Sequence, residues 1–127
     1  MPRALVVDDA KVIRHLLSAT LADQGYEVTQ AANGKEAIEA LQKTPSIELA
    51  MVDWNMPVMT GLDFVKVVRA DPRYSALTVV MVTSETEVDH IVAALEAGAN
   101  DYIMKPFSPE MIAEKLLLLG LVEGQVN

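Results

Sequence analysis

Residues able to do chemistry follow four of the apolar segments in this sequence, and three of them are carboxylic acids. Asp8 and Asp9 follow the first segment, and Asp53 follows a later one. Thr83 and Lys105 follow two more and add a hydroxyl and an ammonium group. Crowded carboxylates repel one another when ionised, and a hard divalent cation with oxygen ligands relieves that repulsion. We therefore predict a site for Mg²⁺, or Mn²⁺ in its place, where Lys105 and Thr83 bind phosphoryl oxygens.

Each of these residues also has an ordinary structural explanation. Asp9 can cap a following helix, and Asp53 can belong to a turn that leads toward Pro57. Thr83 can be a strand residue or a helix cap, and a lysine such as Lys105 is most often solvated. The cation site is favoured because four separate segments end in mutually complementary polar groups, which independent structural roles do not require.

The polar residues can meet only if the apolar segments are parallel strands. Residues 4–7, 49–52 and 77–82 are near-continuous apolar runs, typical of strands covered on both faces, and 27–31 and 102–104 are weaker strand candidates. The segments between and after these runs have a helical period. The pattern predicts an α/β fold: a (βα)₅ doubly wound parallel five-stranded sheet in the flavodoxin-like order 2-1-3-4-5. Ligands bind beyond the carboxyl ends of such strands, where the polar residues lie.

Local signals mark where the five predicted helices begin and end. The first runs from about residue 11 to 24, before Gly25, and the second lies between Gly34 and Pro45. Thr60 and Thr86 each precede an aspartate by three residues, the spacing of a capping box, and start the third and fourth helices. The fourth stops at Gly98. The last begins at Ser108-Pro109 and stops at Gly120.

Composition limits what this protein can be. The chain has 127 residues, no cysteine, and 18 acidic against 10 basic side chains, for a formal charge of −8. This length predicts one domain, residues 1–120, followed by a short C-terminal tail, 121–127. The charge argues against binding nucleic acid or an anionic membrane, because phosphate contacts need clustered Lys and Arg. With no signal-peptide core and no run of membrane-spanning length, a cytoplasmic monomer is expected.

Four short motifs add a more specific signal because they occur in a fixed order. They are Asp8-Asp9; Asp53, Trp54, Asn55, Met56 and Pro57, followed by Thr60-Gly61; Thr83-Ser84; and Tyr102 with Lys105, Pro106 and Phe107. Across residues 3–119 the sequence resembles the response-regulator receiver domain of two-component signalling. It is most similar to the single-domain chemotaxis type, with 1–120 as the receiver domain.

The resemblance implies a role for each matching residue. Asp53 would be the phosphoacceptor, receiving a phosphoryl group from a sensor histidine kinase or a phosphotransfer protein. Asp9 and Asp53 would ligate Mg²⁺ together with the backbone carbonyl of Asn55, and Asp8 would hold metal-bound water. Lys105 would pair with the phosphoryl group, and its bond to the following proline would be cis. Such a protein is a self-phosphorylating switch and not a turnover enzyme.

The resemblance also implies a switch and an output surface. Thr83 would move to bind the phosphoryl group, and Tyr102 would swing into the vacated space. The output face read by an unidentified downstream protein would include Glu87, Val88, Ile91, Leu95, Tyr102, Met104, Ser108 and Lys115. Glu85, Glu87 and Asp89 make its fourth helix acidic, whereas regulators that dock on the flagellar switch often carry lysines there. A phosphate sink or a kinase-control receiver is therefore the alternative to a chemotaxis output.

Two rival classes share parts of this pattern. An aspartate-nucleophile phosphatase needs a second aspartate two residues after the nucleophile, where this chain has Asn55. A flavodoxin-like carrier binds a flavin phosphate after the first strand, where Asp8 and Asp9 would repel it. His15 and His90 are both expected on helices, and His15 is expected to be a lone surface histidine. Trp54 is expected to lie either at the rim of the acidic pocket or in ordinary packing.

Overall fold

Five parallel strands form a single sheet in the computed structural model, which describes residues 2–84 and 88–121. The strands are β1 (Arg3–Val7), β2 (Glu27–Ala31), β3 (Ile47–Asp53), β4 (Thr78–Ser84) and β5 (Asp101–Lys105). Their order, β2-β1-β3-β4-β5, confirms the predicted flavodoxin-like topology. β3 is therefore the central strand, with β1 and β4 on either side of it.

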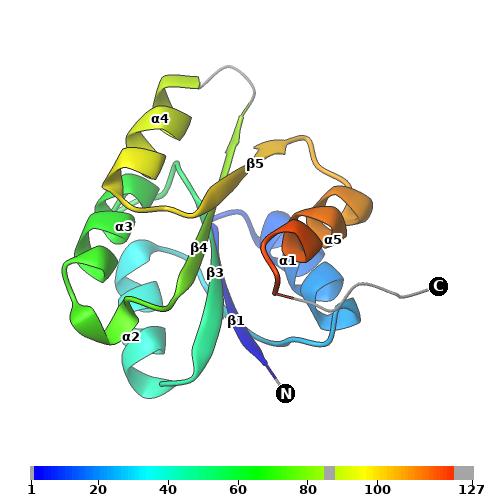
Figure 1. The fold of residues 1–127 in the computed structure, drawn as a ribbon, viewed down its shortest axis with the longest axis horizontal. Helices are drawn as coiled ribbons and strands as arrows, with labels where there is room; N and C mark the ends of the chain where they lie inside the picture. Colours follow the sequence, from blue (N-terminus) through cyan, green and yellow to red (C-terminus); the bar gives the residue numbers. More distant parts are fainter. Residues whose placement is uncertain (1, 85–87, 122–127) are drawn as a thin grey trace.

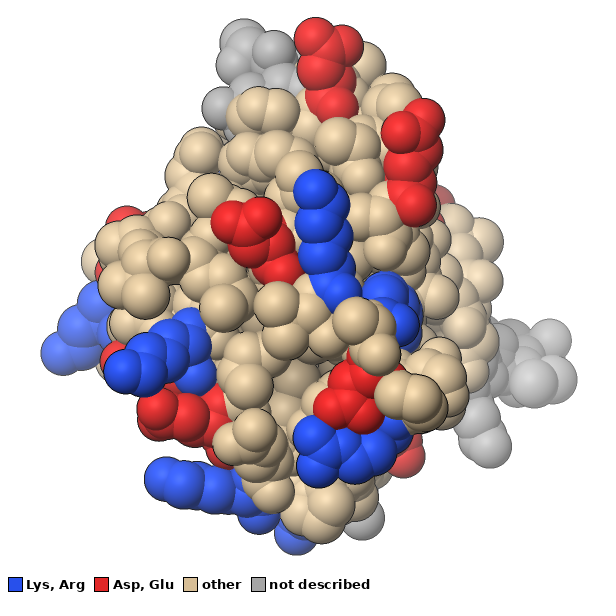
Figure 2. Space-filling view, turned by 90° about the vertical axis from the view of Figure 1, so that its left-hand side faces the viewer, with Lys and Arg blue, Asp and Glu red and all other residues tan. Residues whose placement is uncertain are grey.

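Helices cover both faces of the sheet (Figure 1). α1 (Lys11–Asp23) and α5 (Pro109–Leu118) pack on one face, and α2 (Gly34–Lys43), α3 (Gly61–Arg69) and α4 (Val88–Ala97) lie on the other. Within the described residues, no helix is long and apolar enough to cross a membrane. Figure 2 looks onto the side of α2, α3 and α4, where the acidic and basic side chains shown are interspersed.

Burial on both faces explains why the strands read as continuous apolar runs. On β1, Leu5 and Val7 face the core beneath α2, α3 and α4, whereas Ala4 and Val6 face the core beneath α1 and α5. All four are fully buried. A strand with helices on only one side would alternate apolar and polar residues instead.

The strands extend beyond the apolar runs that predicted them, because backbone pairing does not require an apolar side chain. β3 continues through Asp53, which pairs with Val82 of β4, and Thr83 of β4 pairs with Met104 of β5. β5 continues to Lys105. Asp53 and Lys105 are thus the last residues of their strands and Thr83 is the last but one of β4, so the sheet itself fixes where these three residues stand.

Several predicted helix boundaries are confirmed by cap geometry. Thr60 and Ser108 each accept a hydrogen bond from the backbone N–H three residues later, at 3.1 and 3.2 Å. Gly25, Gly98 and Gly120 adopt φ values of +95°, +117° and +73°, which glycine reaches at little cost. The capping box predicted at residues 86–89 begins outside the described residues. A short 3₁₀ helix, η1 (Pro72–Tyr74), was not predicted.

Candidate functional site

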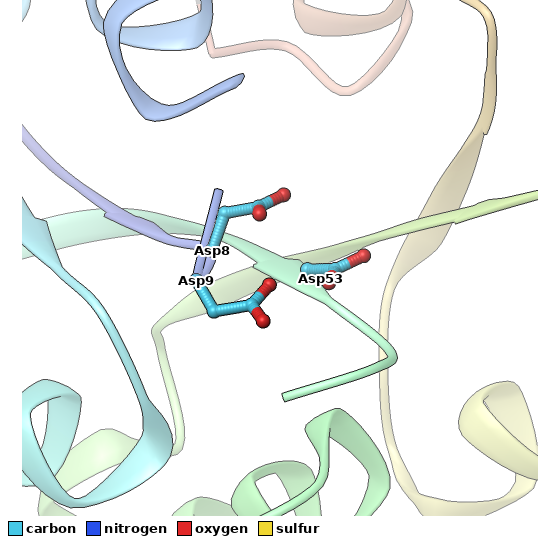
Figure 3. Close-up of side chains that lie close together, drawn as sticks. All are labelled: Asp8, Asp9 and Asp53. Atoms are coloured by element: carbon cyan, nitrogen blue, oxygen red, sulfur yellow. The ribbon is translucent and has the colours of Figure 1, made fainter. Parts of the chain in front are cut away.

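The three predicted carboxylates come together at the carboxyl edge of the sheet. Asp8 and Asp9 follow β1, and Asp53 ends the neighbouring β3. One oxygen from each lies within 4.8 Å of the others, and Figure 3 shows the three side chains extending to the same side of the backbone. Asp8 and Asp53 are 1% and 6% exposed, whereas Asp9 is exposed to solvent. The cluster is therefore partly shielded from water and open on one side.

Lys105 inserts its ammonium group among these carboxylates. Its Nζ donates to Oδ1 of Asp53 at 2.9 Å and to Oδ2 of Asp8 at 3.4 Å. One ammonium does not balance three carboxylates, so negative charge remains in the pocket. Carboxylate oxygens are the ligands that hard cations such as Mg²⁺ and Mn²⁺ prefer. The donor set thus fits a divalent cation that binds by offsetting this remaining charge.

The surroundings of Asp53 shift its proton affinity. The pKa of Asp53 is raised from 3.8 to about 6: burial is the largest cause, the charges of Asp8 and Asp9 add to it, and Lys105 opposes it. Burial alone would lower the pKa of Lys105, but its hydrogen bond to Asp53 and the nearby carboxylates outweigh burial and raise it. At neutral pH the Asp53 carboxylate is therefore mostly ionised, and it forms an ion pair with the charged ammonium of Lys105.

Asp8, and not Asp9, is tied to the start of α1. The N-cap position of α1 is Ala10, whose side chain makes no cap, and the backbone N–H of Ala10 donates to Oδ1 of Asp8 at 2.8 Å. Arg14 donates to the backbone carbonyl of Asp8 at 2.7 Å. The helix-cap explanation of Asp9 is therefore wrong, and its exposed carboxylate is available to a ligand.

The loop after β3 is held on both sides by backbone hydrogen bonds. The N–H of Trp54 donates to the carbonyl of Val82 on β4, at 3.2 Å, and Gly61 at the start of α3 donates to the carbonyl of Trp54, at 3.0 Å. A Cβ atom on Gly61 would lie 2.5 Å from the backbone oxygen of Asp53. Only glycine allows α3 to approach the end of β3 this closely.

Val58, in the same loop, has a backbone conformation that its side chain disfavours. Its φ is +71° although it is β-branched, and it is 81% exposed, so little packing compensates. Asparagine tolerates this region far better. We expect Val58→Asn to raise the free energy of unfolding by about 1 kcal/mol, measured by urea denaturation. The same replacement at Val12, 78% exposed on α1, should give no gain; equal effects at both positions would contradict the strain.

The remaining predicted site residues lie around this pocket. Thr83 is 2% exposed at the end of β4, and Asn55 is exposed in the loop after Asp53. Tyr102 on β5 is half-buried, with the Nζ of Lys115 5.3 Å from its ring centroid. The bond between Lys105 and Pro106 is cis, as the resemblance implied.

The predicted output face is only partly exposed. Val88 and Leu95 of α4 are 57% and 41% exposed, but Ile91 is buried, with 7% exposure. The low exposure of Ile91 was not expected, because the sequence pattern of α4 does not separate its inner from its outer apolar residues. Met104 and Lys115 are half-buried. The acidic residues at positions 85 and 87 lie outside the described residues.

A contact that the sequence did not predict joins the site to α4. The rings of Trp54 and His90 stack with centroids 4.1 Å apart and an interplanar angle of 9°. His90 is half-buried on α4, and His15 is exposed on α1 as expected. No sequence signal reveals this contact, because the two residues lie on separate elements and neither belongs to a periodic pattern with the other.

The fold and the site together define the class of this protein: a flavodoxin-like α/β domain with an acidic, lysine-bearing pocket at the carboxyl edge of the sheet. Within that class, the chain belongs to the response regulator receiver domain family, whose model matches residues 4–117. The resemblance seen in the sequence is therefore confirmed.

Chemotaxis proteins of the CheY type are similar to this chain over nearly its full length. Chemotaxis protein CheY1 of Helicobacter pylori is 44% identical over 120 residues, which are 93% of this chain and 97% of that protein. Chemotaxis protein CheY of Pseudomonas aeruginosa is 39% identical over 115 residues, 90% of this chain and 92% of that protein. The solved structure of chemotaxis response regulator CheY4 of Vibrio cholerae has a TM-score of 0.87 at 40% identity, covering 94% of this chain and 98% of that one.

Proposed function

We propose that this protein is a phosphoacceptor switch that receives a phosphoryl group on Asp53 in a Mg²⁺-dependent reaction. The observation that carries the proposal is the setting of Asp53: a buried carboxylate at the end of the central strand, 2.9 Å from an ammonium and clustered with two further carboxylates. A nucleophile, a cationic partner for phosphoryl oxygens and a set of cation ligands are the parts that phosphoryl transfer to a side chain requires.

The transfer follows from these groups. An oxygen of the ionised Asp53 attacks the phosphorus of the donor, a P–O bond forms, and the P–N bond of a phosphohistidine breaks; the departing imidazole takes up a proton. With a pKa of about 6, Asp53 is mostly ionised at pH 7 and ready to attack. Lys105 offsets charge on the phosphoryl oxygens, and the Thr83 hydroxyl donates to one of them. Bound Mg²⁺ supplies further positive charge.

The cation would be held by oxygen ligands from two strand ends. We assign direct contacts to Asp9, Asp53 and the backbone carbonyl of Asn55, and a water-mediated contact to Asp8. The exposure of Asp9 leaves this side of the pocket open to an arriving cation. The hydrogen bond from Ala10 fixes the orientation of the Asp8 carboxylate that would hold metal-bound water.

The signal would leave through the surface formed by α4, β5 and α5. Thr83 and Tyr102 would change position on phosphorylation, and a downstream protein would read the altered surface. A sensor histidine kinase or phosphotransfer protein is the donor. Because its relatives carry chemotaxis names, we place the protein in chemotaxis or a related phosphorelay. The family match favours this switch over a phosphatase or a flavin carrier.

Acetyl phosphate offers a direct test without a kinase. Incubating the protein with acetyl phosphate and Mg²⁺ should add the mass of one phosphoryl group, measured on the intact protein. Removing the cation with EDTA should reduce labelling to background, because the phosphoryl charge is then opposed by unneutralised carboxylates. Equal labelling with and without EDTA would contradict the role of the cation, and no labelling with either acetyl phosphate or a cognate kinase would contradict the proposed function.

A further inference from the structure

The stacked pair Trp54 and His90 is the only described aromatic ring stack in the structure, and it bridges two functional regions. Trp54 directly follows the phosphoacceptor Asp53, and His90 lies in the first half of α4. The rings are nearly parallel, at 9°, and close, at 4.1 Å. An arrangement with this geometry holds both side chains in place, because each ring loses contact area if the other turns away.

The main chain of Trp54 is already fixed, so the stack completes its restraint. Its N–H and carbonyl are bound to β4 and to the start of α3, at 3.2 and 3.0 Å. The Trp54 side chain also packs against the core beneath α2, α3 and α4. α3 and α4 lie side by side on this face of the sheet (Figure 1). The position of α4 is thereby linked to the residue between Asp53 and Asn55.

We propose that His90 is a positioning residue for the phosphoryl site: through the stack it holds Trp54, and with it the loop that presents the Asn55 carbonyl. This proposal rests on the proposed function, in which that carbonyl is a cation ligand. The contact differs from the predicted rearrangement of Thr83 and Tyr102, because it joins the loop after β3 directly to α4.

The stack makes the pocket and α4 thermodynamically dependent on each other. If the ring of His90 holds the loop in its binding geometry, removing the ring adds the cost of ordering the loop to cation binding. The expected loss of Mg²⁺ affinity is about 3- to 10-fold. By linkage, a partner that displaces α4 changes cation affinity, and the bound cation changes the affinity for that partner by the same factor.

Substitutions at His90 test the role of the ring. Trp54 is the only tryptophan in the chain, so its emission reports the stack without ambiguity. His90→Ala removes the ring, whereas His90→Phe keeps a planar ring and discards every hydrogen bond of the imidazole. His15→Ala, at an exposed histidine on α1, is the matched control. The measurements are Trp54 emission without metal, and Mg²⁺ affinity by calorimetry on protein shown to be folded by circular dichroism.

We expect His90→Ala to shift Trp54 emission to longer wavelength and to weaken Mg²⁺ binding about 3- to 10-fold. The Mg²⁺ affinity of His90→Phe should stay within about twofold of the wild-type value, and that of His15→Ala should equal the wild-type value. Where His90→Ala does not fold, His90→Leu, which fills the volume without a planar ring, takes its place.

Two results would overturn the proposal: Mg²⁺ affinity in His90→Ala equal to the wild type, or a loss in His90→Phe as large as that in His90→Ala. A purely structural role would lower unfolding stability and leave the affinity of the folded protein unchanged. A wild type that neither binds Mg²⁺ nor takes a phosphoryl group would contradict the proposed function itself, and so is distinguishable from a failure of the positioning role alone.

Discussion

Replacing Asp53 with asparagine is expected to abolish phosphoryl labelling and, at pH 7 without Mg²⁺, to make the protein more stable. The first effect follows because an amide oxygen is a poor nucleophile and leaves no carboxylate to form the acyl phosphate. The second follows from the cost of holding an ionised Asp53 in a buried, acidic pocket. Asparagine has nearly the same shape, can still accept from Lys105, and carries no charge to repel Asp8 and Asp9.

The sign of the stability change depends on pH. The pKa of Asp53 is raised from 3.8 to about 6 on folding, so between these values the folded state holds a proton that the unfolded state has lost. Stability contributed by this group therefore falls as pH rises through that interval and stays low above it. At about 1.4 kcal/mol per tenfold change in proton affinity, the gain in Asp53→Asn reaches at most about 3 kcal/mol above pH 6 and vanishes near pH 4.

Urea denaturation at pH 7 and pH 4, with EDTA and with Mg²⁺, measures this prediction. Mg²⁺ at about 1,000 times its Kd should reverse the order, because a ligand at that concentration stabilises the wild type by about 4.1 kcal/mol. Asp23→Asn, at an exposed carboxylate that ends α1, is the control and should alter neither labelling nor the response to Mg²⁺. An Asp53→Asn protein that is less stable than the wild type in EDTA at pH 7 would contradict the electrostatic cost, and one that labels normally would contradict the phosphoacceptor role.

The site could be predicted because its residues are defined by where strands end. Asp53, Thr83 and Lys105 each follow an apolar run. A parallel sheet brings the carboxyl ends of its strands to one edge, and this does not depend on the conformation of the loops. The sheet order was predictable for a similar reason: right-handed crossovers and helices on both faces leave few arrangements of five strand and helix units.

Contacts between separate elements could not be predicted in this way. The stack of Trp54 on His90 depends on how the loop after β3 lies against α4, which no local spacing encodes. The burial of Ile91 could not be predicted for a related reason: on an apolar helix such as α4 the sequence does not show which apolar side chains are buried. Asp9 was a candidate helix cap, but the backbone N–H at the start of α1 donates to Asp8 instead, because Asp8 is the residue that points inward.

Arg69 is another residue whose importance only the structure reveals. From the end of α3 its guanidinium donates to three backbone carbonyls, those of Gly98, Tyr74 and Leu77, at 2.7 to 2.9 Å. It also donates at 2.7 Å to the side chain of Asn100, whose same oxygen accepts from the start of β4. One side chain thus joins the ends of α3, η1 and α4 to the segments that lead into β4 and β5.

Arg69→Met is therefore expected to lower the free energy of unfolding by about 2–4 kcal/mol, because charged donors to several carbonyls are lost together. Arg73→Met is the matched control. Arg73 is exposed and pairs with Asp71, only two residues away, so Arg73→Met should lower the free energy of unfolding much less. Urea denaturation followed by circular dichroism compares the two variants, and equal losses would contradict the role of Arg69. Because Arg69 acts at the amino ends of the strands, opposite the acidic pocket, folded Arg69→Met should keep wild-type Mg²⁺ affinity, which separates support of the fold from support of the site.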